Sequence, residues 1–152
     1  MSHPVTNKSI FATLDHVTIA VTNLERTVKY YESVGFGSFE APARHDFSST
    51  LRGEPMNSKR ATKETWMGPV FLQLVQQVEG ESLVSEFIRR KGEGVFHLGF
   101  IVDNIDEAEV QAVKMGLKIT EKGRRKDGSG YAFFDTEAFA GVTLEIKENP
   151  RK

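Results

Sequence analysis

Residues 14–36, LDHVTIAVTNLERTVKYYESVGF, decide the fold, because the chain repeats their pattern once, without a gap, as VFHLGFIVDNIDEAEVQAVKMGL at residues 95–117. When the two stretches are aligned, apolar positions agree in kind and a few positions are identical. The identical pairs are His16 and His97, Val21 and Val102, Asn23 and Asn104, and Gly35 and Gly116. Self-similarity of this kind indicates that one structural unit occurs twice. We therefore expect two copies of one module.

Each copy predicts a strand followed by a helix. Residues 14–21 alternate between apolar and polar or small side chains, which is the period of a strand with one apolar face. Thr22 or Asn23 is expected to cap the first helix, which Gly35 ends. In the second copy the strand covers residues 95–102, Asp103 or Asn104 caps the helix, and the helix ends before Gly116.

Further strands complete each module. The first helix is followed by a short strand in FGSFEAP, a loop in ARHDFSSTLRGEPMNS, and strands in KRATKETWM and PVFLQLVQQ. The second helix is followed by strands in LKITEKG, YAFFDTE and GVTLEIKEN. We expect one domain over residues 1–152, with module one at 13–78, a connector helix capped by Ser82 at 80–92, and module two at 95–147. The order β-α-β-β-β, used twice, places the chain in the α+β class.

Composition excludes several classes of protein. The 20 basic and 21 acidic residues give a net charge of -1, which offers no electrostatic footprint for nucleic acid or for an anionic membrane. The chain has no cysteine, so a disulfide framework, a Cys-based metal site and a Cys nucleophile are all excluded. No apolar run is long enough for a signal peptide or a membrane span, and we expect a cytoplasmic protein with a small-molecule substrate.

The last strands of the two modules also match each other, and this match predicts a site where four polar side chains meet. PVFLQL and GVTLEI align position for position, which makes Gln73 the counterpart of Glu145. His16 and His97 are counterparts on the opening strands, and all four side chains are expected on the sheet face turned away from the helices. If the opening and closing strands are central and the two halves curl together, these four groups converge in a cleft.

Two imidazoles, an amide oxygen and a carboxylate are suitable ligands for a divalent metal ion. Positions left open for water or substrate are what a catalytic metal requires. One carboxylate leaves the bound ion with about one unit of positive charge, which favours an anionic intermediate such as an enolate. The alternative for each residue alone is structural, because a strand histidine is more often surface or hydrogen-bonded core than a ligand.

The motifs DHVTIAV, FLQLVQ, GEGVFHLGFIVDNID and GVTLEI resemble those of the vicinal oxygen chelate superfamily, which includes glyoxalases, bleomycin resistance proteins and dioxygenases. The resemblance covers roughly Leu14 to Lys147 and is closest to the methylmalonyl-CoA epimerase branch. It implies paired βαβββ modules that form a U-shaped, mostly antiparallel sheet around a divalent metal ion, which could be Co, Ni, Mn, Zn, Mg or Fe. The metal ligands implied are His16, Gln73, His97 and Glu145. A homodimer and a CoA thioester substrate are also implied.

In the epimerase reaction implied by this resemblance, Glu145 and a glutamate ahead of the FLQLVQ strand carry the proton. Glu54 is the nearest counterpart of that second glutamate, and Glu64 competes for the role. The sequence departs from the epimerase branch at Phe96, the residue before His97, where members of that branch commonly have a second histidine. A solvent-exposed loop position explains Glu54 slightly better than the catalytic role does.

Other functions and residues stay open. A glyoxalase I-type lyase or isomerase is the first alternative, and a ring-cleaving dioxygenase or a metal-free drug-binding protein are further ones. The turn at residues 123–130 carries Arg124, Arg125 and Lys126, which could bind the phosphates of CoA or could simply be solvated. His45 could line the cleft mouth or lie on the surface.

Overall fold

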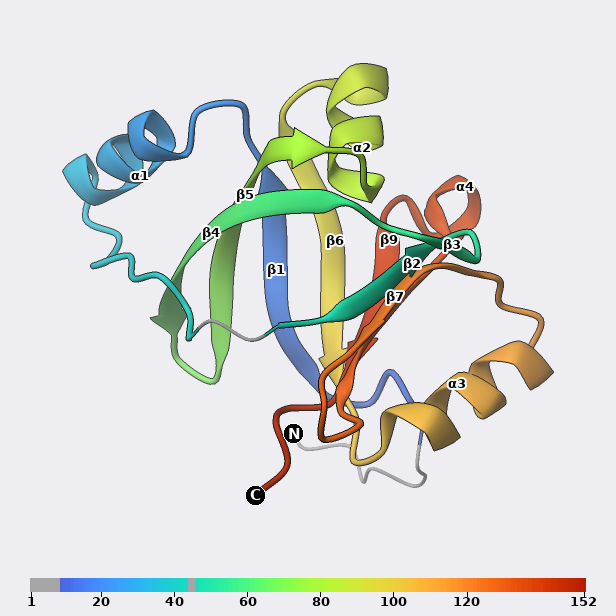
Figure 1. Cartoon of the computed structure of the whole chain (residues 1–152). Coiled ribbons are helices and arrows are strands. Elements are labelled where there is room, and N and C mark those ends of the chain that lie inside the picture. The colour runs from blue at the N-terminus through green and yellow to red at the C-terminus, as the bar shows by residue number, and fades with distance from the viewer. Residues whose placement is uncertain (1–8, 44–45) are drawn as a thin grey trace.

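The computed structural model describes residues 9–43 and 46–152, which form one curled sheet with helices packed on it (Figure 1). Nine strands lie in the order β3-β2-β7-β8-β9-β6-β1-β5-β4. Their bounds are β1 Leu14–Ala20, β2 Ser48–Leu51, β3 Glu54–Pro55, β4 Ser58–Met67, β5 Val70–Gly80, β6 Gly94–Ile101, β7 Ile119–Arg124, β8 Gly130–Phe134 and β9 Thr143–Lys147. The mixed sheet and four helices confirm the α+β class and the glyoxalase-like architecture expected from the sequence.

The internal repeat is visible in the strand register. The opening strands β1 and β6 pair antiparallel at the middle of the sheet, and each pairs in parallel with the closing strand of its own module. Thr18 is the partner of Gln73 on β5, and Gly99, the sequence counterpart of Thr18, is the partner of Glu145 on β9. Gln73 and Glu145 therefore occupy the same place in the two modules, as the aligned sequences predict.

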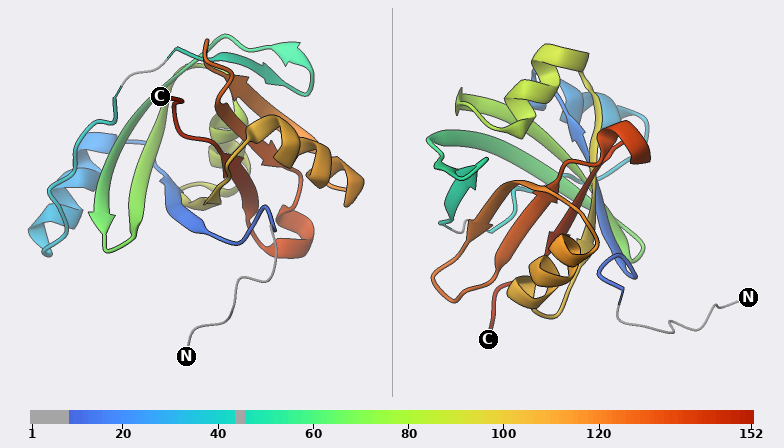
Figure 2. Two further views of the ribbon diagram at one scale, coloured as in Figure 1. Left: turned by 90° about the horizontal axis from the view of Figure 1, so that it is seen from below. Right: turned by 90° about the vertical axis from the view of Figure 1, so that its right-hand side faces the viewer.

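The helices lie on both faces of the sheet. They are α1 Leu24–Ser33, α2 Leu83–Lys91, α3 Ile105–Lys114 and the short α4 Glu137–Ala140. Asn23 and Asn104 cap α1 and α3, with side chains that accept hydrogen bonds from the backbone of Arg26 and Glu107. Figure 2 shows the sheet curling around an interior that α2 approaches from one end. None of the helices in the described part of the chain is long and apolar enough to cross a membrane.

Three apolar clusters build the core of the described part of the chain. The helix α1 packs on the outer face through a cluster that contains Leu24 and Leu74, and α3 does so through one that contains Ile105 and Ile146. The connector helix α2 is different, because its Val84 and Phe87 pack with inward-facing Ala20, Val75, Phe96 and Phe133. The prediction that every helix lies on the face opposite the histidines was therefore wrong for α2, which closes one end of the interior.

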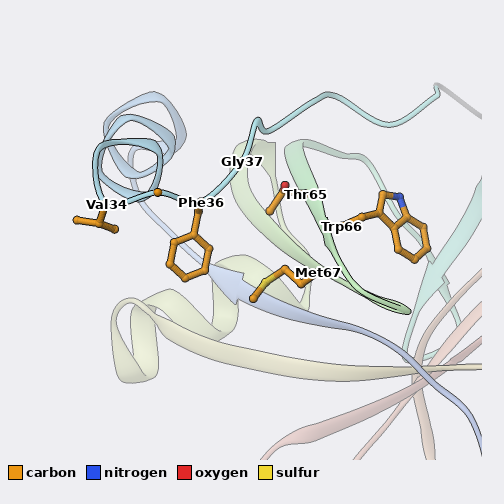
Figure 3. A pocket seen from close by; sticks show the side chains of 7 residues that line it. Val34, Phe36, Gly37, Thr65, Trp66 and Met67 are labelled. Atoms are coloured by element: carbon orange, nitrogen blue, oxygen red, sulfur yellow. The ribbon is translucent and has the colours of Figure 1, made fainter.

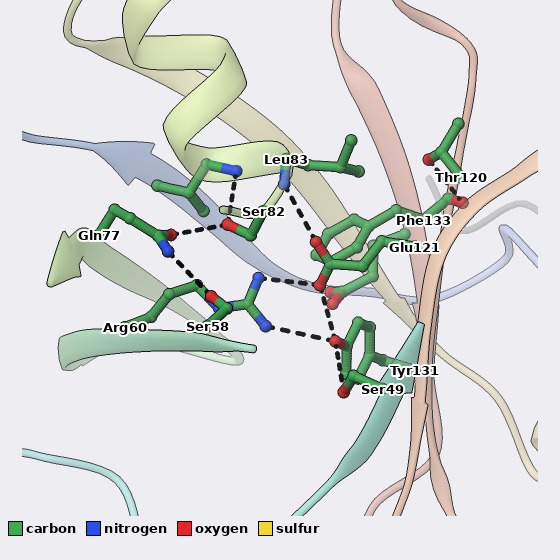
Figure 4. Close-up of polar contacts among 12 residues, drawn as sticks. Ser49, Ser58, Arg60, Gln77, Ser82, Leu83, Thr120, Glu121, Tyr131 and Phe133 are labelled. Carbon is green, nitrogen blue, oxygen red and sulfur yellow. Dashed lines mark hydrogen bonds and ion pairs between the residues drawn. The ribbon is translucent and has the colours of Figure 1, made fainter. Parts of the chain in front are cut away.

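An ion pair between the half-buried Arg60 and the buried Glu121 joins distant strands across this interior (Figure 4). Arg60 on β4 donates to Glu121 on β7 at 2.9 Å, and Tyr131 on β8 donates to the same carboxylate at 2.7 Å. The other oxygen of Glu121 accepts from the backbone of Leu83, at the start of α2. Because β4 and β7 lie far apart in the strand order, this contact requires the sheet to curl back on itself.

The segment between α1 and β4 differs from the sequence prediction. The expected loop contains a hairpin, β2 and β3, whose turn uses Arg52 and Gly53 with φ of 50° and 84°. The strand β2 then pairs with β7 of the second module, a partner too distant in sequence for local pattern to reveal. The strand expected in FGSFEAP is reduced to a single bridge between Glu40 and Glu64. His45 falls outside the described residues.

Candidate metal centre

His16, His97 and Glu145 converge on the inner face of the sheet. They come from β1, β6 and β9, and their exposed fractions are 3%, 3% and 6%. One ligand atom from each lies within 4.8 Å of the others. They are the imidazole and carboxylate members of the predicted quartet, and the fold brings them together from three strands that are far apart in the chain.

The spacing of these atoms fits a metal ion. The Nε2 atoms of His16 and His97 are 3.0 Å apart, and Glu145 Oε1 is 2.9 Å from the first and 3.4 Å from the second. Ligands about 2.1 Å from one ion and at right angles to each other are about 3 Å apart. Glu145 Oε1 is buried and makes no directed hydrogen bond within the described residues. Lone pairs crowded in this way require a cation or a proton between them.

The ionisation of the three groups is coupled. Burial would raise the pKa of Glu145, but the neighbouring rings of His97 and His16 hold it well below its usual range. Burial would lower the pKa of His16, but the charge of Glu145 and a hydrogen bond to Asp15 raise it. The pKa of His97 is lowered, because burial outweighs the attraction of Glu145. At neutral pH the site therefore offers a carboxylate and a neutral His97, both in the form that binds a metal ion.

Gln73 lies beside this cluster. The hydroxyl of Thr18 donates to Gln73 Oε1 at 3.0 Å and also lies 3.0 Å from His97 Nε2. The hydroxyl of Thr18 therefore links the amide oxygen of Gln73 to Nε2 of His97. The amide nitrogen of Gln73 donates to Glu64 at 3.4 Å, which joins the half-buried Glu64 to the same group of side chains.

Glu54 lies elsewhere. It is exposed on β3 at one edge of the sheet, whereas Gln73 and Glu64 lie on β5 and β4 near the other edge. Across residues 9–43 and 46–152, no hydrogen bond or ion pair joins Glu54 to His16, His97 or Glu145. Of the two glutamates that the sequence offered, Glu64 is the one in contact with the predicted quartet.

The basic turn is engaged within the molecule. Arg124 pairs with Asp106 and Glu109 of α3. Arg125 donates to Ser129 and lies over the ring of Phe47, 4.5 Å from its centroid. Lys126 is exposed. Two of the three cations therefore stabilise the turn and its neighbours, and a role in binding phosphate stays a prediction.

Sequence reasoning missed the residues that surround His16. Asp15 Oδ2 lies 2.7 Å from His16 Nδ1 and 2.8 Å from the ammonium of Lys147. Gly99 leaves room for the His16 ring, because a Cβ at Gly99 would lie 2.1 Å from Cε1 of that ring. Only the adjacency of Asp15 and His16 was visible in the sequence, and alternation along a strand argued against contact between their side chains.

A pocket of about 400 Å³ lies outside this cluster, between the end of α1 and β4 (Figure 3). Its lining includes Phe36, Trp66 and Met67. A second apolar pocket of about 350 Å³ shares Phe36 and Met67 and includes Phe71, whose ring stacks on His16 with centroids 4.7 Å apart. Neither pocket is lined by His16, His97 or Glu145.

Comparison with known proteins agrees with this architecture. A curated relative, "Uncharacterized protein YqjC" of Bacillus subtilis (strain 168), is 25% identical over 139 residues, which cover 89% of this chain and 91% of that protein. Among solved structures, methylmalonyl-CoA epimerase from Mycobacterium tuberculosis matches with a TM-score of 0.70 and 20% identity, over 97% of this chain and 95% of that one.

A variant of the Streptomyces coelicolor methylmalonyl-CoA epimerase, in complex with 2-nitronate-propionyl-CoA, matches with a TM-score of 0.68 and 23% identity, over 93% of this chain and 99% of that one. At these identities the likeness of the structures establishes the fold. The family is established separately, because residues 15–134 match the model of the Glyoxalase/Bleomycin resistance protein/Dioxygenase superfamily. With its duplicated βαβββ module and its curled sheet, the chain belongs to that superfamily.

Proposed function

We propose that this protein is a divalent-metal-dependent epimerase that removes and returns a proton next to a carbonyl, with methylmalonyl-CoA or a similar acyl-CoA thioester as substrate. The observation that carries the proposal is the convergence of His16 Nε2, His97 Nε2 and Glu145 Oε1 at distances suited to one ion. The structural likeness to methylmalonyl-CoA epimerases supports the choice of reaction.

In this proposal His16, His97 and Glu145 hold the metal ion, with Gln73 as the fourth ligand. A divalent ion there would stabilise negative charge that develops on a carbonyl oxygen. Burial of His16, His97 and Glu145 strengthens their electrostatic interactions. The homodimer expected from the family resemblance is part of the same proposal.

Proton transfer requires one acid or base on each face of the reacting carbon. Glu145 serves one face in this proposal. For the other face we favour Glu64 over Glu54, because Glu64 contacts Gln73 whereas Glu54 is exposed. Glu64 lies directly opposite Gln73 in the pairing of β4 and β5, so its side chain faces the same interior.

The first test is elemental analysis of the purified protein, followed by exchange of the α-hydrogen of racemic methylmalonyl-CoA in heavy water, measured by mass spectrometry. We expect one divalent ion per chain and exchange that a chelator abolishes. Absence of exchange by the metal-loaded protein would exclude this substrate, and failure to bind any divalent ion would exclude the metal-dependent reaction itself.

The matched variants Glu64→Gln and Glu54→Gln identify the second proton carrier. A positioned general acid or base contributes roughly 10²–10⁴-fold to rate. We expect Glu64→Gln to slow exchange by about that factor with the metal content unchanged, and Glu54→Gln to leave exchange unaltered. The reverse result would assign the role to Glu54.

A further inference from the structure

The two candidate histidine ligands are held in different ways although they occupy equivalent places in the repeat. Asp15 precedes His16, and Phe96 precedes His97. The Nδ1 atom of His16 lies 2.7 Å from Asp15 Oδ2. The Nδ1 atom of His97 is buried without a hydrogen-bond partner in the described part of the chain, and its ring packs against Phe96 and Phe133 with centroids 5.0 and 4.8 Å away.

Lys147 forms an ion pair with the carboxylate of Asp15. Its ammonium lies 2.8 Å from the same Oδ2 atom that contacts His16, and 5.0 Å from the centroid of Phe71. Phe71 in turn stacks on His16, with the ring planes 16° apart. Lys147 and Glu145 are two residues apart on β9, so both side chains lie on the same face of the sheet. The His16 ring is therefore fixed at its edge by Asp15 and on a face by Phe71.

These contacts determine which nitrogen of His16 is free to bind. A neutral imidazole carries one N–H and one lone pair. The carboxylate of Asp15 beside Nδ1 accepts an N–H there, so that when a cation takes the place of a proton between Nε2 and Glu145, the lone pair of His16 is on Nε2. A carboxylate in this position also makes the imidazole a stronger ligand.

We infer that Asp15 is a positioning residue for His16, and that Lys147 acts through Asp15. The inference deepens the proposed function. It rests on that function only for the statement that His16 binds a metal ion. The hydrogen-bonding arrangement that it describes can be tested whether or not a metal ion binds.

The first experiment compares Asp15→Ala and Asp15→Asn with the native chain. Affinity for Zn²⁺ is measured by calorimetry, and the presence of a proton on Nδ1 of His16 in the metal-free protein is measured by long-range ¹H–¹⁵N NMR. We expect Nδ1 of the native His16 to carry a proton, whether or not Nε2, which faces Glu145, also carries one. In Asp15→Ala we expect mixed tautomers and affinity reduced about 10–100-fold. Asp15→Asn keeps an acceptor oxygen and should keep the tautomer, with a smaller loss of affinity.

A double-mutant cycle tests the role of Lys147. If Lys147 acts through Asp15, Lys147→Met should weaken Zn²⁺ binding in the native background and have no effect in the Asp15→Ala background. Additive effects of the two changes would show that Lys147 acts independently, and this would overturn that half of the inference.

Asp103→Ala is the matched control, because it removes an exposed carboxylate from the segment after β6. Circular dichroism verifies that each variant is folded. The inference is overturned if Asp15→Ala keeps the native proton position on His16. It is also overturned if the affinity of Asp15→Ala for Zn²⁺ stays within about twofold of the native value, because removal of a residue that orients a metal ligand is expected to cost about 10–100-fold. Should the native chain bind no metal ion, the proposed function fails, and the tautomer alone decides the role of Asp15.

Discussion

Gly99 shows how one residue can decide the position of a candidate ligand. It lies two residues after His97 on β6, and its α-carbon approaches the ring of His16 so closely that a Cβ would lie 2.1 Å from Cε1 and 2.4 Å from Nε2. Its sequence counterpart in module one is Thr18, whose hydroxyl contacts Gln73 and His97. The two modules therefore use the same position differently, one to supply a hydroxyl and the other to leave space.

We predict that Gly99→Ala displaces the His16 ring. Overpacking a closely filled interior costs about 1–3 kcal/mol, and the displaced ring should also bind Zn²⁺ more weakly. Urea unfolding and calorimetry measure the two effects. Gly94→Ala on the same strand is the control, because a Cβ there meets no atom within 4 Å. Equal stability of the two variants would contradict the prediction.

At the scale of single elements, the paired helices α1 and α3 begin in the same way. Asn23 Oδ1 accepts from the backbone of Arg26, and Asn104 Oδ1 accepts from the backbone of Glu107, both at 3.0 Å. The sequence left Thr22 and Asp103 as alternative caps, and the structure selects the asparagine in each module. Thr22 instead bonds to Glu93.

We predict that Asn23→Ala and Asn104→Ala each lower the free energy of unfolding by about 1 kcal/mol, the usual cost of removing a cap. The two losses should add in the double variant, because the caps lie in different modules and share no partner. Urea denaturation measures them. As a control, Asp103→Ala should stay within about 0.5 kcal/mol of the native chain, and a loss as large as that of Asn104→Ala would assign the cap to Asp103.

At the scale of the whole molecule, the ion pair of Arg60 and Glu121 links the two modules. Glu121 is fully buried, whereas the side chain of Arg60 is 24% exposed. Burial would lower the pKa of Arg60, but the charge of Glu121 raises it above its usual value, so the guanidinium stays charged. The same carboxylate also accepts hydrogen bonds from the hydroxyl of Tyr131 and from the backbone of Leu83 at the start of α2. Glu121 therefore joins the two modules and the connector helix.

We predict that Arg60→Met destabilises the fold by about 3 kcal/mol, because it leaves the charge of Glu121 buried without its partner. The double variant Arg60→Met with Glu121→Gln should recover part of this loss, since the amide carries no charge. Arg89→Met is the control, because Arg89 pairs with Glu81 where both side chains are 59% exposed, and it should cost less than about 1 kcal/mol. Denaturant unfolding distinguishes these outcomes.

Sequence reasoning succeeded where structure is local or repeated. The caps, the ends of the helices and the alternation of β1 follow from neighbours within a few residues. The repeat added long-range information, because aligning its copies predicted that Gln73 and Glu145 would match in register. Sequence reasoning failed for β2 and β3, because their short hairpin pairs through β2 with β7 of the other module.

By itself the sequence determined that one βαβββ unit occurs twice and that His16, His97 and Glu145 belong to matched strands, because strand period and module alignment depend only on residue order. Only the tertiary structure decided which side chains meet across the curled sheet: Asp15 with Lys147, Glu64 with Gln73, and Arg60 with Glu121. Those contacts depend on the curvature of the sheet and on the packing of α2 inside it. Both arise from the sum of many distant contacts, which no local pattern specifies.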